Sequence, residues 1–222
     1  EAISAFKSGR PVMIYDSDYR EMETDLLWHA AAATPEVIRR LRNDCGGLLF
    51  LAIGNEIGEI FGLPWLQDIH SHKSLVEENP VLGHLVTNDL QYDSRSAFTL
   101  SLNHRETYTG ITDRDRSLTT RRFGELSEEL IVKGEDGARA KERLGKEFRT
   151  PGHIPVCRES PGGLKTRQGH TELAVSIARL AGLTACTIGA EMLEPDGDGA
   201  LSVEGARTYA KRHGIPMITG EQ

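Results

Sequence analysis

The sequence predicts an α/β protein built around one mixed β-sheet. Apolar runs of strand length alternate with amphipathic segments of helix length along the whole chain. One of these runs, "LLFLAI" at 48–53, is continuously apolar, which is typical of a strand buried on both faces. The sequence contains no internal repeat and no low-complexity linker, so we expect residues 1–222 to form a single domain.

The elements follow from periodicity and from the residues at their ends. Thr34 is a typical N-cap with Pro35 at the first helical position, and Ser202 and Gly214 mark the two ends of the last helix. The stretch 64–95 is polar and irregular, which is typical of an insertion or a functional loop. Strands are expected at 10–16, 48–53, 96–103, 153–160, 185–192 and 215–218, and helices at 1–9, 34–47, 56–63, 117–132, 171–183 and 202–214.

Composition excludes several classes of protein. The net charge of -7 argues against nucleic acid as the main partner, because phosphate neutralisation needs a basic face. Cys45, Cys157 and Cys186 form neither a disulfide framework nor a zinc-type pair. No apolar run approaches the ~20 residues of a membrane span. We therefore expect a soluble, cytoplasmic protein that acts on neither nucleic acid nor a membrane.

The stretch "DSDYREMETD" at 16–25 concentrates acidic side chains directly after an apolar run. If 20–25 is extended, Glu21, Glu23 and Asp25 share one side of the chain. Carboxylates on one face repel each other unless a cation neutralises them, and their oxygens suit magnesium or manganese. A solvated charged loop would have the same composition. The residues of this stretch alone leave both interpretations open.

The segment "RQGHTE" at 167–172 leads directly into a strongly amphipathic helix. The N-terminus of a helix presents free N–H groups and partial positive charge, so it can bind phosphate. Arg167 would add a bidentate contact and Thr171 a hydroxyl donor. Alternatively, Thr171 and a nearby glutamate act only as a helix cap. Together with the acidic stretch, the segment fits metal-assisted proton chemistry on a phosphorylated small molecule.

Four motifs occur in a recognisable order: "YDSDYREMETD", "AFTLSLNHRETYTGITDRDR", "EFRTPGH" and "RQGHTE". Through them the whole chain resembles the 3,4-dihydroxy-2-butanone 4-phosphate synthases of riboflavin biosynthesis, most of all the archaeal monofunctional form. The resemblance implies a three-layer α/β/α fold and a homodimer with active sites at the subunit interface. It also implies a lyase that converts ribulose 5-phosphate into 3,4-dihydroxy-2-butanone 4-phosphate and formate. Such an enzyme depends on Mg²⁺, for which Mn²⁺ should substitute, with two ions per active site.

The same resemblance implies roles for individual residues, carried over by motif. Glu21 and His170 would be the metal ligands, and His153, Glu191 and Glu23 the catalytic residues. The acidic stretch would close over the substrate as a mobile loop. The implied substrate-binding residues are Asp16, Arg20, Glu21, Asp25, Thr109, Arg167, Gln168, Gly169, His170 and Thr171, of which the last five would bind the phosphate.

Two positions depart from the family pattern. Tyr19 stands where family members are acidic, and Phe50 stands where they often have a cysteine near the site. Two other functions share part of this pattern. A metal-dependent isomerase or aldolase on a related sugar phosphate would differ by releasing no formate. A catalytically silent relative is disfavoured because the metal-binding and proton-transferring residues are all present.

Overall fold

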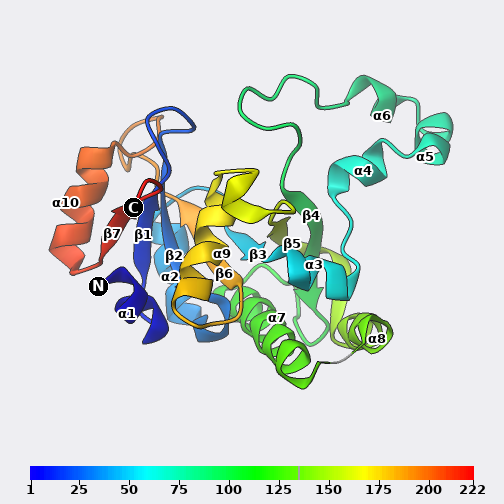
Figure 1. The fold of residues 1–222 in the computed structure, drawn as a ribbon, viewed down its shortest axis with the longest axis horizontal. Coiled ribbons are helices and arrows are strands. Elements are labelled where there is room, and N and C mark those ends of the chain that lie inside the picture. Colours follow the sequence, from blue (N-terminus) through cyan, green and yellow to red (C-terminus); the bar gives the residue numbers. More distant parts are fainter. Residues whose placement is uncertain (135) are drawn as a thin grey trace.

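The computed structural model describes residues 1–134 and 136–222 (Figure 1). Its strands are β1 (Val12–Tyr15), β2 (Thr24–His29), β3 (Phe50–Ile53), β4 (Phe98–His104), β5 (Phe148–Arg158), β6 (Cys186–Glu191) and β7 (Met217–Thr219). Within the described residues these form one sheet of seven strands in the order β4-β5-β3-β6-β2-β1-β7. Neighbours β5 and β3 are parallel, as are β1 and β7, and the other pairs are antiparallel. The predicted mixed sheet is confirmed.

Helices surround this sheet (Figure 1). They are α1 (Ala2–Lys7), α2 (Pro35–Asp44), α3 (Asn55–Phe61), α4 (Leu66–His70), α5 (Lys73–Glu78), α6 (Val81–His84), α7 (Asp113–Lys133), α8 (Gly137–Glu147), α9 (His170–Leu180) and α10 (Val203–His213), with short 3-10 turns at Ala30–Ala32 and Gly163–Lys165. None of the helices described here is both long enough and apolar enough to cross a membrane.

Side-chain alternation in the sheet places the helices in two layers. His29 and Thr187 lie opposite each other in β2 and β6 and so point to the same face. On that face Phe6 of α1 packs edge-on against His29, and Thr187 donates a hydrogen bond to the Ala174 carbonyl of α9. Their neighbour Trp28 points to the other face, where α2 places Arg40 over its ring. Helix α7 packs against α2 on that side, so the sheet is the middle layer.

Several helices begin or end at the capping residues that the sequence predicts. The Thr34 hydroxyl accepts a hydrogen bond from the Val37 amide, and Ser202 caps α10 in the same way. Gly214 ends α10 in the left-handed conformation that glycine adopts without strain. The run 48–53 contains β3, whose four residues are all buried. Strand β2 was not anticipated, although all six of its residues are buried.

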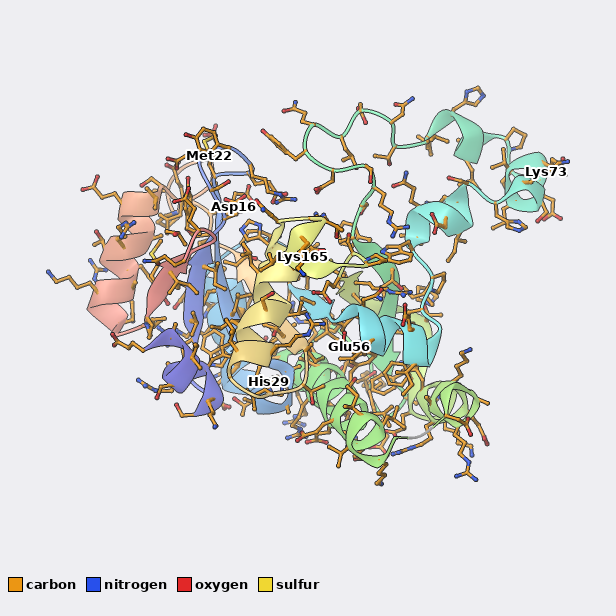
Figure 2. The ribbon with its side chains drawn as sticks, viewed as in Figure 1. Asp16, Met22, His29, Glu56, Lys73 and Lys165 are labelled. Atoms are coloured by element: carbon orange, nitrogen blue, oxygen red, sulfur yellow. The ribbon has the colours of Figure 1, made fainter. Side chains whose placement is uncertain are left out.

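The expectation for 64–95, called the excursion below, was wrong in one respect. It is not irregular throughout, because it contains the short helices α4, α5 and α6. It projects away from the sheet (Figure 1), with Lys73 at its far end (Figure 2). Its base is held by Trp65, whose ring lies 3.5 Å from the guanidinium carbon of Arg95 and 4.1 Å from that of Arg158. The two ends of the excursion are therefore held together beside the end of β5.

Candidate active site

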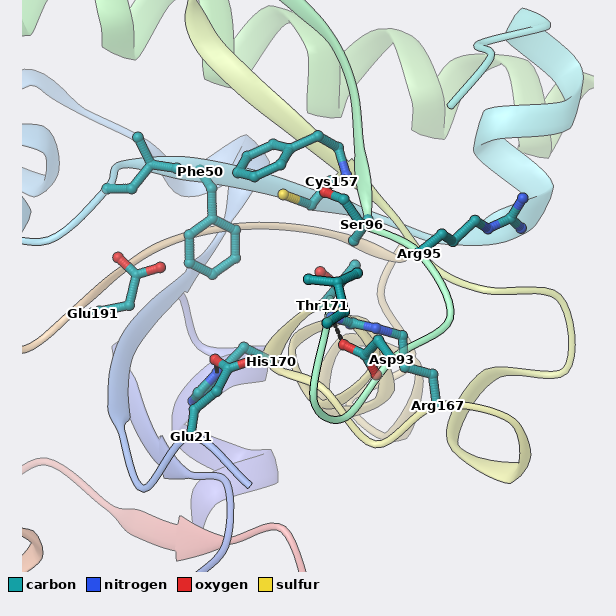
Figure 3. A pocket seen from close by; sticks show the side chains of 14 residues that line it. Glu21, Phe50, Asp93, Arg95, Ser96, Cys157, Arg167, His170, Thr171 and Glu191 are labelled. Carbon is teal, nitrogen blue, oxygen red and sulfur yellow. Dashed lines mark hydrogen bonds and ion pairs between the residues drawn. The ribbon is translucent and has the colours of Figure 1, made fainter. Parts of the chain in front are cut away.

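A cavity of about 240 Å³ opens where β3, β5 and β6 approach the beginning of α9 (Figure 3). Glu21 and Glu191 lie on one side of it, while Arg95, Arg167 and Asp93 lie on the other (Figure 3). Five of the residues that the sequence singled out line this cavity, from three separate segments of the chain. They are Glu21, Arg167, His170, Thr171 and Glu191.

The acidic stretch forms the connection between the antiparallel strands β1 and β2. The buried carboxylate of Asp16 accepts hydrogen bonds from the amides of Glu21, at 2.8 Å, and Glu23, at 3.0 Å. Between them Met22 adopts a positive φ of 58° and lies at the outer end of the loop (Figure 2). The condition of an extended chain therefore holds only for Thr24 and Asp25 in β2, because Asp16 folds the residues before them into a turn.

This turn nevertheless brings carboxylates to His170. Asp16, Glu21 and His170 each offer one ligand atom, and these atoms lie within 4.8 Å of one another. Asp25, which is fully buried, has an oxygen 3.7 Å from His170 Nε2, and neither of its carboxylate oxygens has a hydrogen-bond partner in the described part of the chain. A buried carboxylate without a hydrogen-bond partner is a position where a water molecule or a cation can bind. The carboxylate oxygens suit a hard divalent cation such as Mg²⁺ or Mn²⁺, for which the imidazole nitrogen of His170 is a less usual ligand.

The protonation of this cluster follows from its charges. Burial opposes ionisation of Glu21, but His170 and Arg20 lower the pKa of its carboxyl to about 2. Burial raises the pKa of Asp25 to about 7. Burial also disfavours a charged His170, yet Asp25 and Glu21 raise the pKa of the imidazole to about 10. A protonated His170 therefore offsets part of the negative charge of the cluster, and a metal ion bound by the imidazole would have to displace a proton.

Helix α9 begins at His170 with Gly169 as its N-cap, and no side chain caps it. The alternative in which Thr171 acts as the helix cap is thus wrong. A Cβ on Gly169 would lie 2.2 Å from Arg167 Nη1 and 2.8 Å from Arg20 Nη2. A larger residue here would displace the guanidinium groups, which pack closely against the helix start. We call Arg20, Arg167 and the first turn of α9 the anion site.

Two carboxylates that the sequence did not single out hold these arginines. Glu172, fully buried, accepts from Arg167 Nη1 at 2.6 Å and from the Ser160 amide at 2.9 Å. Asp93 Oδ2 lies 2.7 Å from Arg20 Nη2 and also 2.7 Å from Arg167 Nη2. Figure 3 shows the second of these two contacts. Glu172 stands in the quoted segment "RQGHTE" and could have been found there. Asp93 lies in the excursion, where no sequence pattern marked it.

Glu191 is the last residue of β6 and lies opposite Asp25 in β2. A Cβ on Gly47 would lie 2.5 Å from Glu191 Oε2 and 2.6 Å from the backbone oxygen of Glu191. Glycine is therefore required for this close contact. Burial raises the pKa of Glu191, and burial together with the charge of Glu21 raises that of Glu23. A carboxyl group with a raised pKa can hold and release a proton closer to neutral pH.

Two predicted site residues lie elsewhere. Thr109 lies in the loop before α7. Its hydroxyl is 3.5 Å from Asp115 Oδ2 in the first turn of that helix. The His153 amide donates to Asn103 Oδ1 at 2.8 Å between β4 and β5. Along β5, His153 is about 13 Å from Cys157, which does line the cavity. One chain therefore does not bring the whole predicted set together.

The two departures from the family pattern have different surroundings. The Tyr19 side chain is 86% exposed and does not line the cavity. Phe50 is buried and lines the cavity beside Cys157, which stands on the neighbouring strand β5. Burial raises the pKa of the Cys157 thiol to about 12, so this sulfur stays protonated at neutral pH. A thiol is thus present in the wall, next to the phenylalanine.

Fold and site together have the features of an α/β enzyme that acts on a phosphorylated small molecule with the help of a metal ion. A family model described as 3,4-dihydroxy-2-butanone 4-phosphate synthase matches residues 1–222. The chain belongs to this family of riboflavin-biosynthesis enzymes.

Known relatives agree with this assignment. The chain is 40% identical over 223 residues to the 3,4-dihydroxy-2-butanone 4-phosphate synthase of Methanosarcina mazei, covering 100% of this chain and 87% of that protein. It is 39% identical to that of Methanothermobacter thermautotrophicus, covering 100% and 92%. The predicted resemblance to the archaeal enzymes is confirmed.

Solved structures share the fold. A crystal structure of 3,4-dihydroxy-2-butanone 4-phosphate synthase in complex with two magnesium ions superposes with a TM-score of 0.73 at 26% identity, covering 99% of this chain and 91% of that one. A structure of the Candida albicans synthase gives a TM-score of 0.72 at 27% identity, covering 99% and 92%.

Replacing Glu172 by glutamine should destabilise the protein, because the buried Arg167 loses its fixed negative partner. We expect Glu172→Gln to lower the free energy of unfolding by about 3 kcal/mol. The matched control, Glu142→Gln, breaks an exposed pair with Lys146 and should leave the free energy of unfolding close to that of the wild type. Urea denaturation followed by circular dichroism measures both. Equal losses would contradict the role given to Glu172.

Proposed function

We propose that this protein converts D-ribulose 5-phosphate into L-3,4-dihydroxy-2-butanone 4-phosphate and formate, with Mg²⁺ or Mn²⁺ as cofactor. The observation that carries the proposal is the segment 167–172. It contributes an arginine of the anion site and the histidine that meets Glu21. Membership of the family supports the reaction, and a relative in complex with two magnesium ions supports two ions per site.

In this proposal Glu21 and His170 hold the metal ion, with Asp16 and Asp25 beside them. A divalent cation, when bound, would stabilise negative charge on adjacent substrate oxygens. Asp16 keeps the Glu21 amide in place through the turn. Asp25 provides the buried negative charge next to His170 that favours a cation at this point.

The anion site receives the phosphate group of the substrate. Arg20 and Arg167 supply guanidinium donors, and the helix start from Gln168 to Thr171 supplies backbone N–H groups. The anion site and the metal cluster share one helix start, so a substrate held by its phosphate would extend toward His170. That arrangement orients a short sugar phosphate for reaction.

Proton transfers require groups that both accept and donate. Glu191 and Glu23, whose pKa values are raised by burial, can serve this purpose beside the metal cluster. His153 can do the same as an imidazole, and Asn103 fixes its ring through Nδ1. Apolar walls formed by Phe50, Leu48 and other residues help to keep water from reactive intermediates.

We further propose a cytoplasmic homodimer of single-domain chains, with each active site completed by the partner. His153 and Thr109 do not line the cavity of their own chain. The loop that carries Thr109 presents exposed apolar side chains, with Tyr108 at 94% and Ile111 at 50% exposure. A two-fold axis would let two such loops each reach the cavity of the other chain.

The reaction is tested by incubating the purified protein with ribulose 5-phosphate and magnesium and assaying formate. We expect formate in proportion to the substrate consumed. EDTA should stop the reaction, and added Mg²⁺ or Mn²⁺ should restore it. An absence of formate, with no effect of EDTA, would overturn the proposal. Substrate consumption without formate would point to an isomerase or aldolase instead.

His153→Ala should abolish turnover while leaving substrate binding largely intact, because His153 transfers protons and binds neither metal nor phosphate. His84→Ala, at an exposed position of the excursion, should retain activity and serves as the control. Turnover by the formate assay and substrate binding by calorimetry measure the two effects.

Mixing subunits then tests the shared site. Inactive His153→Ala and inactive His170→Ala protomers, unfolded and refolded together, should regain about a quarter of wild-type activity, since each mixed dimer has one intact site. No recovery in the mixture, with mixed dimers shown to form, would contradict a site built from two chains.

A further inference from the structure

The anion site is occupied by a side chain of the protein itself. One oxygen of Asp93 lies 2.7 Å from Arg20 Nη2 and 2.7 Å from Arg167 Nη2. All three side chains are largely buried, with Asp93 at 15% exposure. An anionic oxygen bridging two guanidinium groups at a helix start is the contact that a phosphate oxygen would make.

Asp93 belongs to a segment with few other attachments. It lies in residues 86–95, which we call the arm, where the excursion returns toward the sheet. The end of the arm is held by Arg95, whose guanidinium group lies over the ring of Trp65. Among residues 88–94, it is Asp93 that makes the hydrogen bonds and ion pairs with the rest of the described chain. Its apolar side chains Leu90 and Tyr92 are 43% and 54% exposed.

Glu172 differs from Asp93 in the way it is held. It stands on α9, is fully buried and also accepts a hydrogen bond from a backbone amide. Asp93 reaches the same arginine from the arm, which lies outside the sheet and its helices. Arg167 thus has one counter-ion fixed on α9 and one on a segment with few other attachments.

We propose that Asp93 is an internal anion that occupies the anion site of the ligand-free protein and is displaced by an incoming phosphate group. The proposal rests on the proposed function for the identity of the natural ligand. A phosphate dianion beside Asp93 would place like charges next to each other around the same two guanidinium groups. Its oxygens can take over both Nη2 donors, so Asp93 leaves and the arm is released.

The exchange would couple the binding of phosphate to the position of the arm. While Asp93 is bound, it lowers the apparent affinity for phosphate, because a tethered competitor has a high local concentration. Once phosphate is bound, the arm is free to adopt another position over the cavity, whose lining includes Leu90. The two arginines remain paired in both states.

The test is Asp93→Asn, with binding of inorganic phosphate measured by calorimetry in metal-free buffer. We expect the Kd for phosphate to fall about tenfold, because the tethered competitor has lost its charge. Asp89→Asn is the matched control, since Asp89 is exposed on the same arm and loses the same charge. Its Kd should change by less than about twofold. An unchanged or higher Kd for Asp93→Asn overturns the proposal.

Limited proteolysis of the arm by chymotrypsin gives an independent readout, because Leu90 and Tyr92 are exposed cleavage positions on it. In the wild type, saturating phosphate should raise the rate of cleavage within the arm. In Asp93→Asn that rate should already be high, and phosphate should not change it. An unchanged rate in the phosphate-saturated wild type would also overturn the proposal. Neither measurement needs turnover, so a protein that makes no formate could still confirm the exchange, and an active enzyme could still refute it.

Discussion

The contact between His170 and the carboxylates of the β1–β2 connection is the interaction on which the site depends. The sheet order sets β2 beside β6, and α9 packs on both, so the first residue of that helix meets Glu21 and Asp25. Asp25 is fully buried and lacks a hydrogen-bond partner among the described residues, so without a cation its charge would be costly. The fold therefore builds a position that favours either a positive charge beside Asp25 or a proton on Asp25 itself, whose pKa burial raises to about 7.

The protein meets this requirement with its own groups at two adjacent points. A proton on His170 offsets part of the charge of Glu21 and Asp25, and Asp93 bridges Arg20 and Arg167. Each is a small internal substitute for a ligand that the proposed reaction needs, a metal ion in one case and a phosphate group in the other. Ligand binding then becomes an exchange within a site that is already ordered, and it requires little rearrangement of α9 or of the sheet.

Much of the fold could be predicted because its signals are local, as with the cap at Thr34 and the buried run at 48–53. The turn at Glu21 could not, since it depends on the Asp16 carboxylate accepting two particular amides. The family motifs identified the residues around His170, but periodicity alone did not. Asp93 lies 73 positions from Arg20, and no sequence pattern connects the two.

The central claim is that Glu21 and His170, distant in the sequence, hold one metal ion. Pulsed electron paramagnetic resonance of bound Mn²⁺, on protein labelled with ¹⁵N-histidine, tests it most directly. We predict a histidine nitrogen coupling in the wild type and in His153→Gln that is lost in His170→Gln. Coordination by oxygen alone in the wild type, or a coupling that persists in His170→Gln, would contradict the claim.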